Sequence, residues 1–462
     1  MFSAEQGTSR TGSGGTAETK PTTLLVAALV GLYAAQLVLI ALSAYTDPHP
    51  GGSRGLPLLV LDDRDDSVFS TKRMVESLAL LLIVCLESTL LYLIWRRLRD
   101  VTRRIAYVPV AVGTTVMLAL SLCAPVLLSA DPYLYVGYSL IGSLAYSPPA
   151  APFGGEYAVI NKWWGTPLLP APYGPLFIGY LHALLSAVPS LTLKLEALRI
   201  ANSFWFLLAL WFLRQARTAS ASLSLIALNP AIAYLFVANA HNDIIGITLI
   251  LGALALAVRY PVASVAMMVA ATLIKAPLAI IGLPVLSRLR AERRAGYVAA
   301  TLFCAAATSL LAGGGPYVRA LRIDASAHLI TAPELHVALI AVAVVALTIG
   351  LMGKRWAQTA SFAMPAFAAR MFSWYSLWGL PYAAVAGRLA AFAILLPIVA
   401  YLMESCFDTR VAKLSVALVL LGLALTTLAR RRTGASRVQF SSAGPPPRLL
   451  EAGPSAKGSS IV

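Results

Sequence analysis

Residues 228–251, LNPAIAYLFVANAHNDIIGITLIL, place three adjacent polar residues, His241, Asn242 and Asp243, between two long apolar runs. Apolar runs of this kind are typical of membrane helices, because a helix needs about 20 mainly apolar residues to cross the hydrocarbon core. Polar side chains at the edge of a bilayer are costly unless they have partners. The stretch therefore predicts a helical membrane protein with a candidate functional site between two of its spans.

The composition of the whole chain supports a membrane protein. Of its 462 residues, 58% are hydrophobic and 12% are charged, and the mean hydropathy is +0.76. Soluble proteins carry about 25% charged residues. The net charge of +16 first suggests a nucleic-acid partner. However, the basic residues form short clusters between apolar runs, as topology signals do, so we expect a multi-pass protein of the cell membrane and no nucleic acid.

The apolar runs predict an all-α, polytopic transmembrane fold with about 12–14 membrane segments. Its parts are a disordered cytoplasmic N-terminus over 1–21, two transmembrane helices with an outer loop over 22–104, a core over 105–353, C-terminal transmembrane helices over 354–429, and a basic, disordered cytoplasmic tail over 430–462. Two outer loops are expected within the core, over 131–172 and 313–334.

The number of crossings in the core decides which side the polar residues face. If residues 173–189 cross fully, His241 falls inside and Arg259 outside. If residues 173–189 do not cross, His241 lies outside and Arg259 inside. The run 261–287 must then also return to its starting side, as two half-helices with Lys275 near the outer turn. We prefer the second arrangement, because it keeps more arginines on the cytoplasmic side.

The first outer segment contains a carboxylate, Asp131, where a span leaves the bilayer. Such a group is poorly solvated on one side, which favours a role as a general base. Alternatively, Asp131 followed by Pro132 has the pattern of a helix N-cap and first helical residue. The aromatic residues of the segment are either interface anchors or sugar contacts.

The polar triplet and a lone lysine further along also have two interpretations each. The triplet is suited to binding a metal, holding a phosphate or pairing with the outer segment, while Asp243 alone is suited to capping the helix that follows. Lys275, in the apolar stretch LIKAP, is either the partner of an anionic lipid headgroup or a side chain that snorkels to the interface.

Two later segments combine arginine with aromatic or polar residues. Arg370 precedes Trp374 and Tyr375 in RMFSWYSLWGLPY, and Arg319 and Arg322 lie in the second outer loop. Aromatic faces stack on the C–H groups of a sugar ring, and a guanidinium pairs with phosphate. This combination favours a ligand that carries both a sugar and a phosphate.

Five stretches in this order resemble the C-type (GT-C) integral-membrane glycosyltransferases, and more narrowly the polyprenyl-phosphate-mannose-dependent α-1,6-mannosyltransferases of bacteria. They are DPYLYVGYSLIGSLAYSPPAAPF, PAPYGPLF, LNPAIAYLFVANAHNDIIGITLIL, LIKAPLAIIGLP and FSWYSLWGLPYAA, within residues 131–384. The chain departs from the paired acidic motif of many GT-C enzymes, because Asp131 stands alone before Pro132.

The resemblance implies a GT-C fold in which 105–353 is the catalytic core. It implies transfer of a sugar, expected to be mannose, from a polyprenyl monophosphate donor to a glycan or glycolipid acceptor on the outer face of the membrane. Asp131 is then the catalytic base, and Asp243 orients the site or binds a metal. The residues expected to bind the donor phosphate are Lys275, His241, Asn242, Arg319, Arg322 and Arg370. Those expected to bind sugar are Tyr133, Trp163, Trp164, Tyr173, Trp374 and Tyr375.

The resemblance assigns no cofactor, and a divalent metal stays an open question. The rival interpretation is a multi-span transporter or lipid flippase, for which polar midplane residues and related halves are typical. The sequence shows little midplane polarity and no internal repeat. A structural subunit without activity is a second rival, against which the long aromatic outer segments count.

Overall fold

A computed structural model of the chain describes residues 19–46, 71–100, 103–124, 129–216, 218–331 and 372–405, and the following statements refer to these residues. They contain helices and no strand, which confirms the all-α prediction. Several sequence predictions lie outside the described residues. These are most of the disordered N-terminus, the C-terminal tail, the apolar runs over 335–352, 357–369 and 411–429, and Arg370.

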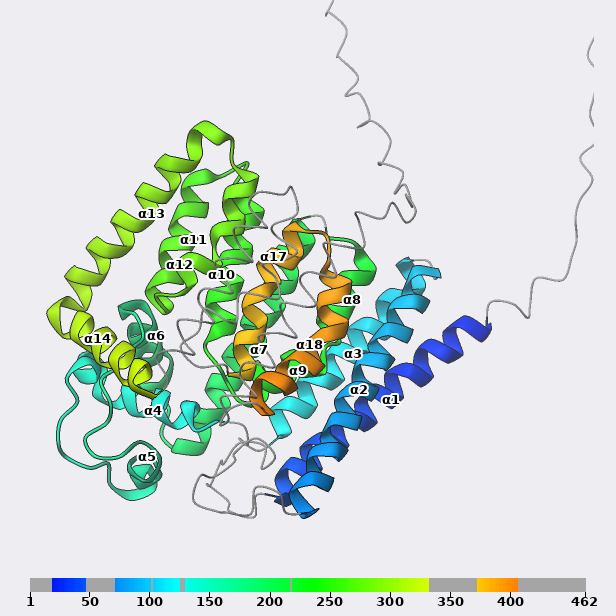
Figure 1. The fold of residues 1–462 in the computed structure, drawn as a ribbon, viewed down its shortest axis with the longest axis horizontal. Helices are drawn as coiled ribbons and strands as arrows, with labels where there is room; N and C mark the ends of the chain where they lie inside the picture. The colour runs from blue at the N-terminus through cyan, green and yellow to red at the C-terminus, as the bar shows by residue number, and fades with distance from the viewer. Residues whose placement is uncertain are drawn as a thin grey trace, which may run out of the picture.

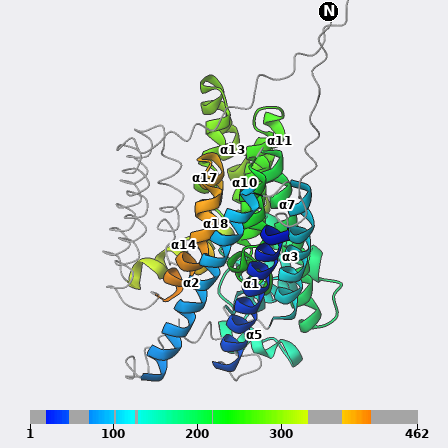
Figure 2. The same cartoon turned by 90° about the vertical axis from the view of Figure 1, so that its right-hand side faces the viewer.

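The first three helices are α1 (Thr19–Thr46), α2 (Thr71–Asp100) and α3 (Arg103–Cys123). They lie side by side at one edge of the molecule (Figures 1 and 2). Val30 on α1 and Leu82 on α2 leave 60% and 61% of their surface exposed. Long helices with exposed apolar faces are expected where lipid is the solvent, because the hydrocarbon core excludes unpaired polar groups but not apolar side chains.

The segment after α3 contains five short helices. They are α4 (Asp131–Ile141), the 3₁₀ helices η1 (Gly142–Tyr146) and η2 (Gly155–Tyr157), α5 (Ala158–Trp164) and α6 (Pro175–Leu185). The predicted outer loop over 131–172 is therefore partly helical. At 1.5 Å per residue, α6 is about half as long as the ~30 Å hydrocarbon core. It is too short to cross alone, as the preferred topology requires.

The middle of the chain forms the central helices. They are α7 (Leu191–Gln215), α8 (Ser220–Ala227), α9 (Pro230–Ile232), the π-helix η3 (Ala233–Ala238), α10 (Asp243–Leu256), α11 (Pro261–Ile274), α12 (Leu278–Ile281) and the 3₁₀ helix η4 (Leu283–Arg288). The axis bends by 41° between α8 and the segment Pro230–Ala238, a geometry shared by broken spans and re-entrant loops.

The predicted break in the run 261–287 is confirmed at Lys275. The backbone there is extended, with φ −155° and ψ 120°, and it separates α11 from α12. Pro277 explains the break, because it has no amide hydrogen to donate to the carbonyl of Leu273, four residues earlier, and its ring would clash with that carbonyl in a continuous helix.

The last described elements are α13 (Ala291–Ala312), α14 (Gly314–Thr331), the 3₁₀ helix η6 (Ser373–Gly379), α17 (Leu380–Val385) and α18 (Leu389–Ser405). The predicted outer loop over 313–334 is largely the helix α14. In both ribbon views, α13 begins at the end of the molecule opposite α5 and α14 (Figures 1 and 2).

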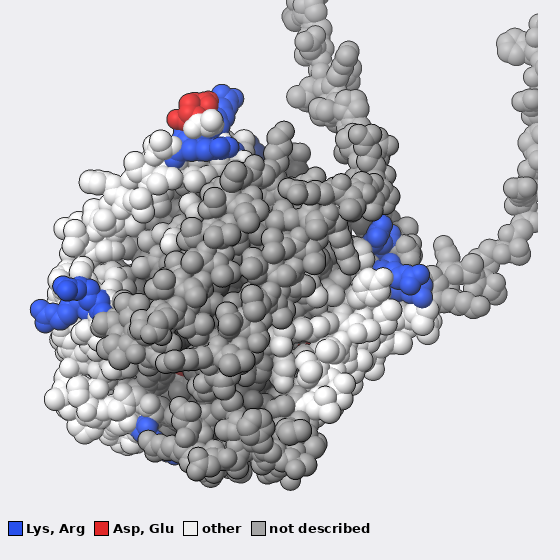
Figure 3. All heavy atoms as spheres, in the orientation of Figure 1, with Lys and Arg blue, Asp and Glu red and all other residues white. Residues whose placement is uncertain are grey.

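Length and composition identify four described helices as candidate membrane spans, or five with the bent pair, and six shorter apolar helices accompany them. On the face drawn in Figure 3, lysines and arginines gather in separate small groups, and uncharged residues cover most of the remaining described surface. This pattern is that of a polytopic membrane protein, in which charges are confined to the ends of the spans.

Candidate functional site

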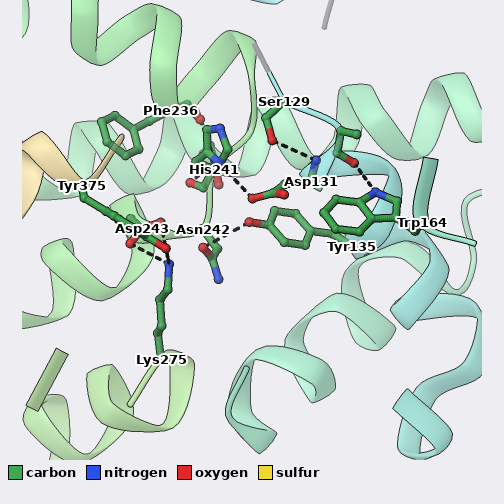
Figure 4. A network of polar contacts seen from close by, with 12 residues as sticks. Ser129, Asp131, Tyr135, Trp164, Phe236, His241, Asn242, Asp243, Lys275 and Tyr375 are labelled. Carbon is green, nitrogen blue, oxygen red and sulfur yellow. Dashed lines mark hydrogen bonds and ion pairs between the residues drawn. The ribbon is translucent and has the colours of Figure 1, made fainter. Parts of the chain in front are cut away.

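Four chain breaks meet at the candidate site, which Figure 4 shows in close view. They are the start of α4, the turn between η3 and α10, the break between α11 and α12, and η6. Each of them brings side chains that the sequence analysis selected. The site therefore contains Asp131, the triplet at 241–243, Lys275 and the aromatic residues of η6.

Lys275 and Asp243 form a buried ion pair. The Lys275 Nζ lies 3.1 Å from Asp243 Oδ1 and 3.2 Å from Oδ2, and the Trp378 Nε1–H donates to the same Oδ1 at 2.8 Å. The side chain of Asp243 is fully buried and that of Lys275 is 12% exposed. This arrangement bears on two of the sequence interpretations. Lys275 has an acidic partner within the chain, and Asp243 makes no helix-capping hydrogen bond, since the N-cap of α10 is Asn242.

Aromatic rings surround the ammonium group of Lys275. Its Nζ lies 4.6 Å from the ring centroid of Tyr375, 5.7 Å from that of Trp378 and 5.9 Å from that of Tyr173. The Nζ is also 3.5 Å from the Tyr375 hydroxyl. Cations are attracted to the faces of aromatic rings, most strongly where water is excluded. These rings therefore hold the charge of Lys275 inside the protein instead of allowing it to snorkel to the interface.

A second pair joins Asp131 to His241. The His241 Nδ1 lies 3.5 Å from Asp131 Oδ2, a distance compatible with an ion pair, although the geometry is not that of a hydrogen bond. His241 is fully buried, whereas 16% of the Asp131 side chain is exposed. The imidazole stacks on Trp374 with 3.7 Å between ring centroids and 20° between planes. Asp131 is therefore the member of the pair that a substrate can reach.

The carboxylate of Asp131 is not used as a helix cap. The N-cap of α4 is Ala130, and it makes no side-chain capping hydrogen bond. The Asp131 amide instead donates to Ser129 Oγ at 3.0 Å, and the Trp164 Nε1–H donates to the Ala130 carbonyl at 3.0 Å. These contacts hold the backbone at the start of α4 and leave the carboxylate available for chemistry.

Several buried polar atoms of the site have no hydrogen-bond partner among the described residues. They are both ring nitrogens of His241 and the Nδ2 of Asn242. The Asn242 Oδ1 accepts a hydrogen bond from the Tyr135 hydroxyl at 3.2 Å. Buried polar groups in proteins are nearly always paired, so unpaired ones in a cluster of this kind indicate a place for a ligand.

Sequence reasoning missed two residues of this cluster, Tyr135 and Trp378. Tyr135 follows Asp131 by one helical turn on α4, and this spacing could have placed both on one face of a helix. Trp378 lies one turn beyond Trp374 in the stretch RMFSWYSLWGLPY. Its bond to Asp243 has no sequence signal, because the two residues are far apart in the chain.

The remaining predicted residues lie around or away from the cluster. Tyr133 is buried on α4, and Tyr173 packs edge-on against Tyr135, with 5.5 Å between the ring centroids. Trp163 is half-buried and lies beneath Lys162, whose Nζ is 5.9 Å from the ring centroid. Arg319 and Arg322 are exposed on α14, so they do not belong to the buried cluster.

The described residues do not offer a ligand set for a metal. No group of three His, Cys, Asp or Glu side chains among them is arranged to hold an ion. Asp243, which the sequence suggested as a metal ligand, is already bonded to Lys275 and Trp378. The proposed sugar transfer therefore uses side chains of the protein and no metal.

Comparison with protein families identifies the chain. Residues 24–292, more than half of its length, match the N-terminal domain model of the alpha-(1->6)-mannopyranosyltransferases. No curated protein and no solved structure matches the chain. The matched region contains Asp131, the triplet at 241–243 and Lys275, and it confirms the resemblance seen in the sequence. The chain therefore belongs to the alpha-(1->6)-mannopyranosyltransferase family and is a membrane-embedded mannosyltransferase.

Proposed function

We propose that the protein transfers mannose from a polyprenyl monophosphate donor to a glycan or glycolipid acceptor on the outer face of the cell membrane. The observation that carries this proposal is the position of the Asp131–His241 pair in the same cluster as Lys275. A partly exposed carboxylate beside a buried cation suits a reaction in which a hydroxyl loses its proton and a phosphate leaves.

The proposed step is a single displacement with inversion at the anomeric carbon. The acceptor hydroxyl oxygen forms the new bond to that carbon while the bond to the donor phosphate oxygen breaks. Asp131 takes the proton of the hydroxyl, and the polyprenyl phosphate leaves with the bonding electrons. His241, which faces Asp131 and stacks on Trp374, keeps the carboxylate in the orientation that this proton transfer requires.

Lys275 contributes to phosphate binding in competition with Asp243. An ammonium has three N–H donors, and the Nζ of Lys275 contacts both oxygens of Asp243 and the hydroxyl of Tyr375, so a phosphate binds by displacing one of these partners. Asp243 therefore orients Lys275 and neutralises it until a donor arrives. The unpaired Asn242 amide and His241 ring supply further polar contacts for the phosphate. The proposal leaves out Arg319 and Arg322, because both are exposed on α14.

The aromatic residues complete the sugar site. Tyr375 and Tyr173 lie next to the polar groups, and aromatic faces suit the C–H groups of a mannose ring. Trp374 is stacked between His241 and Phe372, so both of its faces are occupied and it holds the imidazole instead of a sugar. Trp164 acts differently, since its indole N–H is bonded to the backbone just before Asp131. A transporter is not proposed, because the family match is to an enzyme.

The test is mannosyl transfer by the purified protein in lipid vesicles. Polyprenyl-phosphate mannose and a nucleotide-linked mannose are offered as donors in separate reactions. We expect transfer from the lipid donor only, with release of polyprenyl phosphate. Asp131→Asn keeps the size of the side chain but removes its basicity, and should lower kcat by about 10²–10⁴-fold.

The control variant is Glu156→Gln, which removes an exposed carboxylate from the same outer segment. It should leave kcat unchanged. Transfer from the nucleotide donor alone would contradict the proposed donor, and near-normal turnover by Asp131→Asn would contradict the assignment of the base.

A further inference from the structure

The backbone that carries His241 has two unusual conformations in succession. Residues Ala233–Ala238 form a π-helix, and Ala240 has a positive φ of 49°. π-Helical turns are rare and occur often at functional sites. A positive φ is unfavourable for an alanine, because its Cβ crowds the backbone. This turn therefore depends on contacts from outside itself to keep its shape.

Asn202 of α7 supplies the first of these contacts. Its Nδ2 donates to the carbonyl of Phe236 at 2.6 Å and to the carbonyl of His241 at 3.0 Å. The Asn202 side chain is buried, with 3% of its surface exposed. The amide group of Asn202 thus bonds to the π-helix at Phe236 and to His241, which are the residues on either side of the turn.

Arg199, one helical turn earlier on α7, makes the second contact. Its Nε donates to the carbonyl of Ala238 at 2.8 Å, and its Nη1 donates to the carbonyl of Leu122 at 3.3 Å, near the end of α3. The guanidinium is paired with Glu196 at 2.7 Å, so its charge is compensated. Arg199 therefore joins the end of α3 to the turn that carries His241.

We propose that Arg199 and Asn202 are positioning residues that set the distance and orientation of His241 relative to Asp131. They lie three residues apart on α7, so both project from the same face of one long helix. A rigid helix that fixes two separate backbone segments keeps a catalytic pair in register without touching the substrate. The inference rests on the proposed role of Asp131 and His241.

The experiment compares two buried asparagines that both donate hydrogen bonds to backbone carbonyls, one at the turn that carries His241 and one elsewhere. Asn202→Leu keeps the volume of the side chain and removes its donor, while Asn202→Ser is a milder variant in case the first does not fold. Asn229→Ser is the matched control. Asn229 is also fully buried and donates to a backbone carbonyl, that of Ala393 at 2.7 Å. Its Oδ1 accepts from the amides of Ala231 and Ile232 at the start of α9, so its loss should act there and not at the turn over 239–241.

We expect the Asn202 variants to lower kcat by about 10²-fold, because a misplacement of about 1 Å can cost this much. The KM for polyprenyl-phosphate mannose should change less than kcat, because Lys275 also holds the phosphate and makes no hydrogen bond to Asn202. Hydrogen exchange of the amides in 236–243 should become faster in these variants and remain unchanged in the Asn229 control. Arg199→Lys, which keeps the charge but loses the fork geometry, should act in the same direction.

Two results would overturn the inference. One is a kcat for Asn202→Ser within about twofold of wild type, well below the expected change. The other is hydrogen exchange in 236–243 that does not respond to either Asn202 variant. Wild-type protein that transfers no mannose from the lipid donor would instead refute the proposed function, and the exchange measurement would still test the role of Asn202.

Discussion

The buried pair of Lys275 and Asp243 makes a quantitative prediction about stability. The two charges are 3.1 Å apart, and the side chain of Asp243 is fully buried. At an effective dielectric constant near 20, charges at this separation attract each other by about 5 kcal/mol. Removing one member of such a pair costs about 3–5 kcal/mol, because the other charge is left buried without compensation. Lys275→Met should therefore lower the free energy of unfolding by about this amount.

Asp243→Asn should cost a similar amount, about 3–5 kcal/mol, because it leaves the buried ammonium of Lys275 without its counter-charge. In the double variant neither charge remains, so the second substitution should add little to the first. The double variant should be clearly more stable than the sum of the two single effects predicts.

The measurement is the free energy of unfolding of the four proteins in mixed micelles, combined as a double-mutant cycle. Lys162→Met is the control for loss of a lysine, because Lys162 is exposed, and surface substitutions usually change stability by less than about 0.5 kcal/mol. Single effects that add within about 0.5 kcal/mol would refute the coupling. A stable Lys275→Met protein with unchanged KM for the donor would show that Lys275 serves neither the fold nor the phosphate.

Two further predictions concern the topology and the sugar site. Single cysteines are introduced in a cysteine-free background and tested with an impermeant probe. Lys162→Cys should react from the outer side and Arg259→Cys from the cytoplasmic side. Labelling of both from one side would exclude the preferred topology. Beside the sugar site, Trp374→Ala should lower kcat/KM by about 2–10-fold, because it removes the ring that stacks on the imidazole of His241, and Trp374→Phe should restore most of the activity, as measured by mannosyl transfer. Equal activity of both variants and wild type would show that Trp374 has no role in the site.

The sequence predicted those parts of the fold that depend on local chemistry. Long apolar runs predicted helices, and the proline after Lys275 correctly located a break, because proline acts on its own neighbours in the chain. Within the two predicted outer loops, only the helix that begins at Asp131 was suggested by the sequence, through the pair Asp131 and Pro132. The residues of these loops, rich in Pro, Gly and aromatic side chains in 131–172, carry no long apolar run, which was the signal used to recognise a helix.

The site was predicted residue by residue but not as a set of pairs. Asp131, His241 and Lys275 stood out because each is polar at the end of an apolar run. Which of them meet depends on how separate helices pack, and this information is absent from any local pattern. The partner of Lys275 was therefore sought in a ligand, although Asp243 supplies it. Arg199 was missed for the same reason, since its contacts are backbone carbonyls distant in sequence.

The geometry of the helix pair α10 and α11 explains why the central charges occur where they do. The two helices follow each other through a short connection over 257–260, so the start of α10 and the end of α11 lie at the same end of the pair. Asp243 is the first residue of α10 and Lys275 caps α11. A carboxylate at a helix N-terminus and an ammonium at a C-terminus both complement the helix dipoles. Each charge is thus stabilised by its own helix as well as by the other charge, which allows both to stay buried. A donor phosphate that draws the ammonium away from Asp243 exchanges one anionic partner for another, so Lys275 keeps a counter-charge throughout the proposed reaction.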